Sequence, residues 1–163
     1  MGAVIEVEAD IRRSPEEVFD YVSDPANEPE WNIRMKRVEK ISSGALGIGG
    51  RYMMEFTQGP PAVSDVRRFE RPILWELDGG SKIISSRFEG RVVPRDDGSC
   101  LFIRMEVRPR GVLRLAAPLV RRRMQRELAR DIVQIKGRLE TNRRDGMRTI
   151  CASVTSAQTS GGR

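Results

Sequence analysis

The feature that most constrains the fold is a run of six strand patterns followed by a single long helical pattern. Between residues 37 and 108, apolar or aromatic residues recur at every second position, and clusters of turn residues separate the runs. The predicted strands cover residues 37–42, 51–57, 62–70, 73–78, 83–94 and 100–108. Because the separators are short, as at Asp96-Asp97-Gly98, we expect consecutive strands to pair as an antiparallel meander.

A further strand and a short helical corner precede this meander. Residues 3–11 alternate between apolar and mostly acidic side chains, which predicts a strand with one buried face. Ser14 is predicted to cap a helix of two to three turns, because Glu17 completes a Ser-x-x-Glu capping box. A residue before proline avoids helical geometry, so the helix should end at Asp24, with a second short helical turn at residues 26–31.

After residue 112 the apolar period changes from two to between three and four. A turn at residues 112–118 is predicted to precede a helix of about twenty residues. The apolar stripe of this helix consists of Met124, Leu128, Ile132, Ile135 and Leu139. Residues 142–163 lose this periodicity and are rich in Ser, Thr and Gly, so we expect one domain over residues 1–141 and a flexible tail over residues 142–163.

The order of these elements predicts an α+β fold of the helix-grip type. Only one long helix is available to cover a seven-stranded antiparallel sheet, so the sheet must curl around it. The two short helices lie between the first and second strands, where they would form a corner that closes one end of the grip. The fold is therefore predicted from the order of the elements and from the single long helix that is available to cover the sheet.

Composition removes several classes of catalytic and metal site. The sequence has no histidine, which is the commonest general base near neutral pH and a common zinc ligand. It has neither a phosphate-binding glycine loop nor a metal-spaced cysteine cluster, and we expect no metal and no cofactor. Cys100 and Cys151 are predicted to be free thiols. With no apolar run long enough to span a bilayer, the protein is expected to be soluble and cytoplasmic.

Three segments carry a resemblance to a known superfamily. They are SPEEVFDYVSDPANEPEWN at residues 14–32, GIGGRYMMEF at 47–56 and GSCLFIRMEVRPRGVLRLAAPLVRRRMQRELARDIVQIKGRLE at 98–140. These segments resemble the polyketide cyclase/dehydrase branch of the START-like superfamily, also called SRPBCC or birch-pollen-allergen-like. The resemblance covers about residues 3 to 140 and implies an internal cavity between the curled sheet and the long helix.

Strand alternation and the helical stripe indicate which side chains would line such a cavity. The candidate ligand-binding residues are Trp31, Tyr52, Met54, Phe56, Trp75, Phe88, Ile103, Met105, Met124, Leu128 and Ile132. Each of them also suits a simple hydrophobic core, whereas the set together favours a small apolar ligand of lipid or polyketide type. Our leading hypothesis is therefore non-enzymatic binding or transport of such a ligand.

The resemblance also keeps an enzymatic alternative open, namely a polyketide cyclase or dehydratase. Without histidine, the side chains that could polarise a carbonyl in the predicted cavity are Tyr52, Asp65, Ser86 and Arg87. Ser86 and Arg87 are neighbours on one strand, so only one of them can point inward. Surface or structural roles suit each of these residues better than catalysis, and no catalytic residue is assigned.

Positive charge is concentrated near the C-terminus. Residues 108–148 contain thirteen Arg or Lys residues and four Asp or Glu residues. Arg122, Arg126 and Arg130 follow at four-residue spacing and predict a cationic ridge opposite the apolar stripe. Such a ridge suits an ordinary solvated helix face, and it would also suit contact with a partner protein or weak contact with an anionic membrane. Because aromatic stacking residues are missing there, no specific nucleic-acid binding is expected.

Overall fold

The computed structural model describes the backbone of residues 2–156 and the side chains of residues 2–141. The strands are β1 (Ala3–Ile11), β2 (Met35–Lys40), β3 (Arg51–Phe56), β4 (Ala62–Glu70), β5 (Leu74–Gly80), β6 (Ile84–Arg95) and β7 (Gly98–Pro109). The helices are α1 (Pro15–Ser23), α2 (Glu28–Trp31) and α3 (Ala117–Ser156), with 3-10 turns η1 (Pro25–Asn27) and η2 (Gly111–Ala116).

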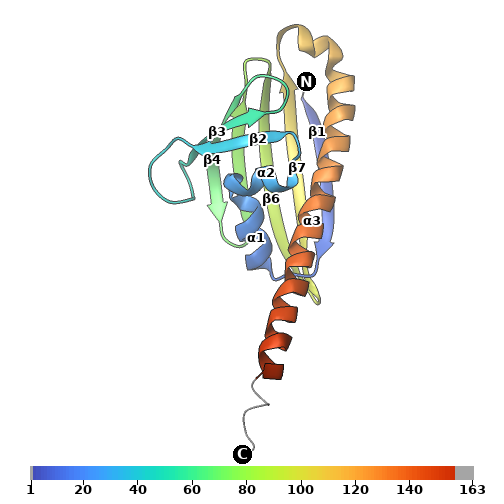
Figure 1. Ribbon diagram of the computed structural model, residues 1–163. Helices are drawn as coiled ribbons and strands as arrows, with labels where there is room; N and C mark the ends of the chain where they lie inside the picture. The colour runs from blue at the N-terminus through green and yellow to red at the C-terminus, as the bar shows by residue number, and fades with distance from the viewer. Residues whose placement is uncertain (1, 157–163) are drawn as a thin grey trace, which may run out of the picture.

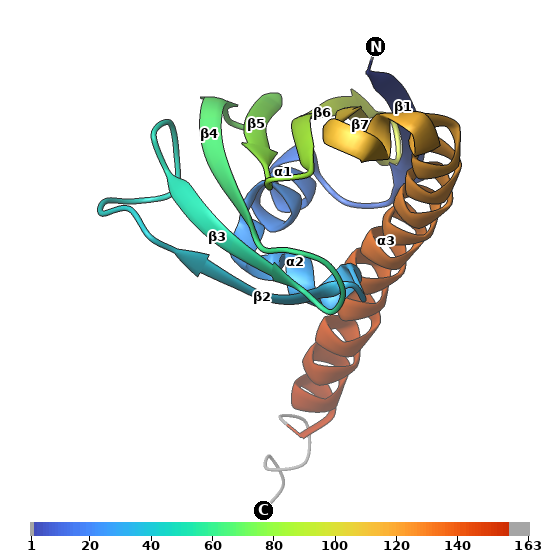
Figure 2. The ribbon, with the colours of Figure 1, turned by 90° about the horizontal axis from the view of Figure 1, so that it is seen from above.

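All seven strands form one antiparallel sheet in the order β1-β7-β6-β5-β4-β3-β2. Strands β2 to β7 follow one another as the predicted meander, whereas β1 pairs with β7 at the opposite edge, from Ala3 against Val107 to Ile11 against Ser99. The sheet curls, and α3 runs along its concave side beside β1 (Figures 1 and 2). The structure thus confirms the helix-grip fold, with α1 and α2 between the first two strands.

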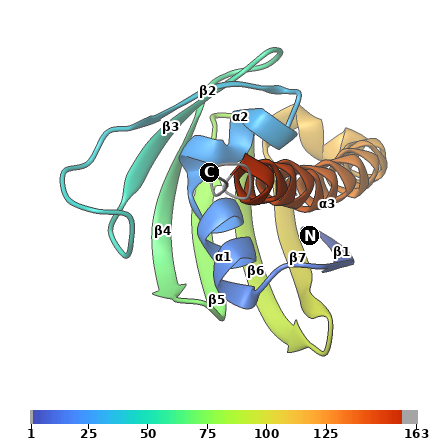
Figure 3. The same ribbon diagram turned by 60° about the horizontal axis from the view of Figure 1, so that its bottom comes forward.

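The helical corner forms as its capping residues predict. The Ser14 hydroxyl accepts a hydrogen bond from the Glu17 backbone N–H at 3.3 Å, and the Glu17 carboxylate accepts one from the Ser14 backbone N–H at 3.0 Å. Asp24 ends α1 and caps η1 by accepting a hydrogen bond from the Ala26 backbone N–H at 3.0 Å. Figure 3 shows α1 and α2 on the same side of the sheet as α3, so all three helices face the interior.

The hydrophobic core lies where α1 packs on β6 and β7 and where α3 packs on β1 and β7. Phe19 of α1 is fully buried, and its ring meets the Trp75 ring edge to face at a centroid distance of 5.3 Å. From α3, the predicted stripe contributes the buried side chains of Leu128, Ile132, Ile135 and Leu139. Burial of this stripe holds α3 against β1 and β7. The N-terminal half of α3 covers the part of the concave face of the sheet that the core does not fill.

The boundaries of some elements differ from the sequence predictions. Strand β5 begins at Leu74, and Ile73 lies before it with an exposed side chain. The α3 backbone continues to Ser156 and is longer than the predicted twenty residues. The side chains of residues 142–163 lie outside the described part of the chain, so the flexible tail stays a prediction. Within residues 2–156, no helix has the length and apolarity needed to cross a bilayer.

Candidate ligand-binding cavity

A cavity of about 430 Å³ lies between the concave face of the sheet, α2 and the N-terminal half of α3. Strand alternation places apolar side chains of β2 to β7 on this face, and the apolar stripe of α3 supplies the opposite wall. The apolar walls include Met54, Phe56, Trp75, Leu77, Phe88, Met105, Val120, Met124 and Leu128. The volume of the cavity is within the usual range of small-molecule sites. Like those sites, the cavity is lined mainly by apolar and aromatic side chains.

Eight of the eleven sequence-predicted residues line this cavity. They are Trp31, Met54, Phe56, Trp75, Phe88, Met105, Met124 and Leu128. The other three, Tyr52, Ile103 and Ile132, are buried but are not part of the cavity lining. Ile103 and Ile132 pack in the hydrophobic core, where close neighbours occupy the space that a ligand would need. Ligand contact by any of the eleven residues stays a prediction.

The side chains weighed for catalysis separate between the two faces of the sheet. Ser86 lines the cavity, whereas Arg87 is exposed and pairs with Asp78 at 2.8 Å. Asp65 likewise pairs with Arg51 at 2.6 Å, on the outer face. Among these candidates, only the Ser86 hydroxyl therefore lies in the wall of the cavity.

One part of the cavity wall is polar and was missed by the sequence analysis. Glu28 and Asn32 come from α2 and its C-terminal cap, and Glu127 and Asp131 come from α3. The Asn32 side-chain amide donates a hydrogen bond to the Glu28 carboxylate at 2.9 Å. Arg34 pairs with Glu127 at 2.8 Å and so joins the corner to α3. We call Glu28, Asn32, Arg34, Glu127 and Asp131 the polar end of the cavity.

Glu28 and Asp131, the two carboxyl groups of the polar end that form no ion pair with the described side chains, have raised pKa values. Burial raises the pKa of Glu28 to about 7, and the nearby Asp131 charge adds to this effect, although the Asn32 amide opposes it. Burial also raises the pKa of Asp131 to about 6, against the attraction of Arg34. Both groups therefore change protonation state near neutral pH, which is typical of buried carboxyl groups in binding or catalytic clefts.

A signal for the polar end was present in the helical pattern. Asp131 follows Leu128 by three positions and precedes Ile132, so it interrupts the apolar stripe with a charge. Glu127 lies three positions after Met124 and has the same relation to the stripe. A charged residue inside a buried stripe indicates either an ion pair or a polar site. Here Glu127 forms an ion pair with Arg34, and both Glu127 and Asp131 line the polar end of the cavity.

Three segments border the cavity at the end of the molecule that carries η2. They are the β3–β4 turn with Gln58 and Pro60, the β5–β6 turn with Ser81 and Ile83, and residues 113–120 of η2 and α3. All three connect elements at the same end of the sheet in Figure 1. We call these three segments the mouth of the cavity.

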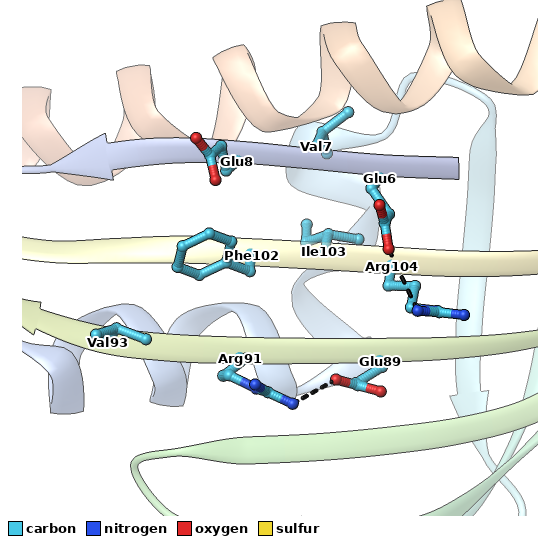
Figure 4. A pocket seen from close by; sticks show the side chains of 9 residues that line it. All are labelled: Glu6, Val7, Glu8, Glu89, Arg91, Val93, Phe102, Ile103 and Arg104. Atoms are coloured by element: carbon cyan, nitrogen blue, oxygen red, sulfur yellow. Dashed lines mark hydrogen bonds and ion pairs between the residues drawn. The ribbon is translucent and has the colours of Figure 1, made fainter. Parts of the chain in front are cut away.

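A second hollow, of about 620 Å³, lies on the outer face of the sheet over β1, β7 and β6 (Figure 4). Four of its five charged side chains form ion pairs, since Arg104 pairs with Glu6 at 3.3 Å and Arg91 pairs with Glu89 at 3.0 Å. Although this hollow is larger, five of its nine lining residues are charged, whereas the lining of the cavity between the sheet and α3 is mostly apolar. The cavity is therefore the better candidate site for an apolar molecule. Among the described residues, no group of three or more acidic or cysteine side chains is arranged to hold a metal ion.

Comparison with known families decides the classification. A family model described as polyketide cyclase / dehydrase and lipid transport matches residues 2–140. The chain belongs to this family. The resemblance to polyketide cyclase/dehydrase proteins seen in the sequence is thereby confirmed. No curated protein matches the chain in sequence.

Solved structures share the fold of this polyketide cyclase / dehydrase and lipid transport family member. A START superfamily protein from Mycobacterium smegmatis is 16% identical, with a TM-score of 0.70 over 85% of this chain and 97% of that one. The Zhui aromatase/cyclase from Streptomyces sp. R1128 is 14% identical, with a TM-score of 0.70 over 86% and 94%. A protein of unknown function from Staphylococcus aureus is 14% identical, with a TM-score of 0.70 over 88% and 97%. At such identities the likeness shows the fold alone.

Proposed function

We propose that this protein binds or transports a small apolar molecule, of lipid or polyketide type, in the cavity between the sheet and α3, without chemically changing it. The observation that carries the proposal is the cavity itself, about 430 Å³ with walls made mostly of apolar side chains. Burial of apolar ligand surface against such walls contributes about 25 cal/mol for each Å² removed from water. Four methionines in the wall, Met35, Met54, Met105 and Met124, suit ligands of varied shape because the thioether chain adapts easily.

The polar end supports a ligand that carries one hydrogen-bonding group on an apolar body. Glu28 and Asp131 can each donate or accept a proton near neutral pH, and Asn32 lies beside them. The indole Nε1 atoms of Trp31 and Trp75 are buried in cavity-lining residues and have no hydrogen-bond partner among the described residues. A hydroxyl or carbonyl oxygen on the ligand would satisfy such donors, since an unpaired buried N–H is costly.

The test is a titration with a solvatochromic apolar dye, supported by native mass spectrometry of gently purified protein. Met54→Trp should fill part of the cavity and lower dye affinity by about tenfold or more while the protein stays folded. Met53→Trp is the matched control, because Met53 is the neighbour of Met54 on β3 and does not line the cavity. Equal dye binding by both folded variants would count against the cavity as the binding site.

A second candidate function, polyketide cyclisation or dehydration, is favoured by the two carboxyl groups at the polar end. A carboxyl group with a pKa of about 6 or 7 can act as a general acid or base at neutral pH. If the protein is such an enzyme, Glu28→Gln and Asp131→Asn should each abolish formation of aromatic product from a synthetic poly-β-ketone thioester. If it is a carrier, the wild type should bind this compound and form no more product than buffer does.

A further inference from the structure

The mouth of the cavity carries an exposed apolar surface. The side chains of Val112 and Leu115 in η2 are 87% and 90% exposed, and that of Leu119 in the first turn of α3 is 70% exposed. Large apolar side chains that are almost fully exposed to water do not gain the stabilisation that burial of their surface would give. Neighbours in the same segment, Leu113 and Val120, turn inward and line the cavity.

Positive charge surrounds these side chains. Residues 108–126 contain seven arginines and no Asp or Glu. Arg110, Arg114 and Arg121 are exposed, and none of them forms an ion pair with the side chains that the structure describes. The apolar side chains Val112, Leu115 and Leu119 together with Arg110, Arg114 and Arg121 are called the mouth surface below.

The mouth surface continues into the cationic ridge predicted from the sequence. Leu119 precedes Arg122 by three positions on α3, so the two share a helix face, and Arg126 follows one turn later. Arg122, Arg126 and Arg130 are all exposed. The ridge therefore leads away from the mouth along α3, and it is the apolar residues of η2 that distinguish the mouth from an ordinary charged helix face.

We propose that the mouth surface docks onto anionic lipid bilayers, with Val112, Leu115 and Leu119 inserted among the lipids and the arginines on the headgroups. An apolar patch bordered by arginines matches the surface of an anionic bilayer. The acyl chains would contact the apolar residues, and the anionic headgroups would pair with the arginines. A protein partner with acidic residues would match the arginines but would not require two nearly fully exposed side chains on a single 3-10 turn.

The position of the surface gives docking a consequence for the cavity. Because Leu113 and Val120 alternate with the exposed apolar residues, the bound bilayer would lie directly against the mouth. An apolar molecule could then pass between bilayer and cavity without crossing water. This last step rests on the proposed function, whereas docking itself does not.

The experiment is co-sedimentation of the full chain with vesicles of phosphatidylcholine, alone or mixed with phosphatidylglycerol, at low ionic strength. Wild-type protein should bind the mixed vesicles and not the neutral ones. Replacing Arg110, Arg114 and Arg121 together by Gln should lower the affinity by about 100-fold, since each cation near an anionic surface contributes about 1 kcal/mol. Replacing Val112 and Leu115 together by Ser should lower it by about tenfold or more.

Matched controls change the same residue types elsewhere on the surface. Ile41 and Ile48, in the β2–β3 loop, are also exposed, and their replacement by Ser should leave vesicle binding unchanged. Replacing the exposed residues Arg12, Lys36 and Arg95 by Gln removes the same net charge away from the mouth and should reduce binding only slightly. All variants concern exposed side chains, so thermal unfolding should stay close to that of the wild type.

Each outcome has a defined meaning. No binding of the wild type to anionic vesicles at low salt would overturn the proposal, because screening is weakest there. Equal losses in the mouth and control charge variants, or an unchanged Val112/Leu115 variant, would reduce the effect to general electrostatic adsorption and would also overturn it. Dye binding without vesicles should be the same in all variants, so a protein that fails to bind dye but docks would refute the proposed function alone.

Discussion

The indole of Trp75 lies directly against the backbone of Gly90, its antiparallel partner on β6. A Cβ atom at position 90 would be 2.1 Å from Cζ2 of Trp75, far inside contact distance. The missing side chain thus makes the space in which Trp75 reaches the Phe19 ring and the cavity wall. Gly90 therefore serves a steric purpose, and one methyl group there should disturb both the core and the cavity.

Gly90→Ala should destabilise the protein by about 1–3 kcal/mol and alter the fluorescence of Trp75, because the buried ring must shift. Gly137→Ala is the control, since no atom of the described residues lies within 4 Å of the Cβ it would add on α3. That change should stabilise the helix by about 0.5–1 kcal/mol. Thermal unfolding of both variants measures the contrast, and a neutral Gly90→Ala would contradict the packing described here.

Ile135→Ala should cost about 2–5 kcal/mol of the free energy of unfolding, because Ile135 is fully buried where α3 grips the sheet. Val133→Ala, two residues earlier on the same helix, is the control, because Val133 is exposed and its truncation leaves no cavity. Urea unfolding should separate the two by several kcal/mol. Similar midpoints would mean that α3 does not pack on the sheet through this face.

Asp131→Asn should stabilise the protein at neutral and alkaline pH, with no comparable gain in acid. The folded pKa of Asp131 is raised to about 6, so its contribution to stability is fully present below about pH 4 and is lost as the pH rises through 6. Asparagine does not titrate, so the gain of the variant over the wild type should grow by about 1–3 kcal/mol between pH 4 and pH 8. Urea titrations at several pH values measure it.

Asp20 gives the opposite sign and serves as the comparison for this pH effect. The Arg71 guanidinium, 2.6 Å away, lowers the pKa of Asp20. Its contribution is present above the ordinary carboxyl pKa and is lost as the pH falls, so Asp20→Asn should weaken the protein slightly at neutral pH and not in acid. If both variants changed with pH in the same direction, the assigned environments would be wrong.

Ser14→Ala should destabilise the protein by about 1 kcal/mol, because it removes the side-chain oxygen that caps α1. The Ser14 backbone N–H also lowers the pKa of the Glu17 carboxylate, so this cap should weaken when the pH falls. Ser43→Ala, in the exposed β2–β3 loop, should change the melting temperature little. A silent Ser14→Ala would show that α1 is held by its packing alone.

The fold could be predicted because the local sequence patterns agree with the need for one long helix to cover the seven-stranded sheet. The capping box, the alternation of β1 and the stripe of α3 each report on neighbours close in sequence, and all three appear in the structure as expected. Element ends were less exact, as at Ile73, which a strand pattern includes although its side chain is exposed. A strand ends where its partner ends, and that is decided by residues far away in sequence.

Only those residues of the candidate site whose position follows from the periodicity of a single strand or helix could be predicted. Alternation on β3 and β6 brought Met54 and Phe88 to the cavity, but it could not distinguish them from Ile103, which faces the same side and is covered by core neighbours. The polar end requires α2 and α3 to meet, so Glu28 and Asp131 approach each other only in the folded chain. The helical pattern of α3 marks Asp131 as a charge within the apolar stripe, but no local pattern shows that Glu28 lies near it.

The pairing of β1 with β7 also has a consequence for protein synthesis. β1 is translated before the rest of the sheet, yet the residues opposite it, Ser99 to Val107, follow about a hundred positions later. At typical translation rates, the nascent strand waits for about 5–20 seconds without its partner. During that time Glu6, Glu8 and Asp10 keep one face of the strand charged, which discourages pairing with strands of other chains on the same message.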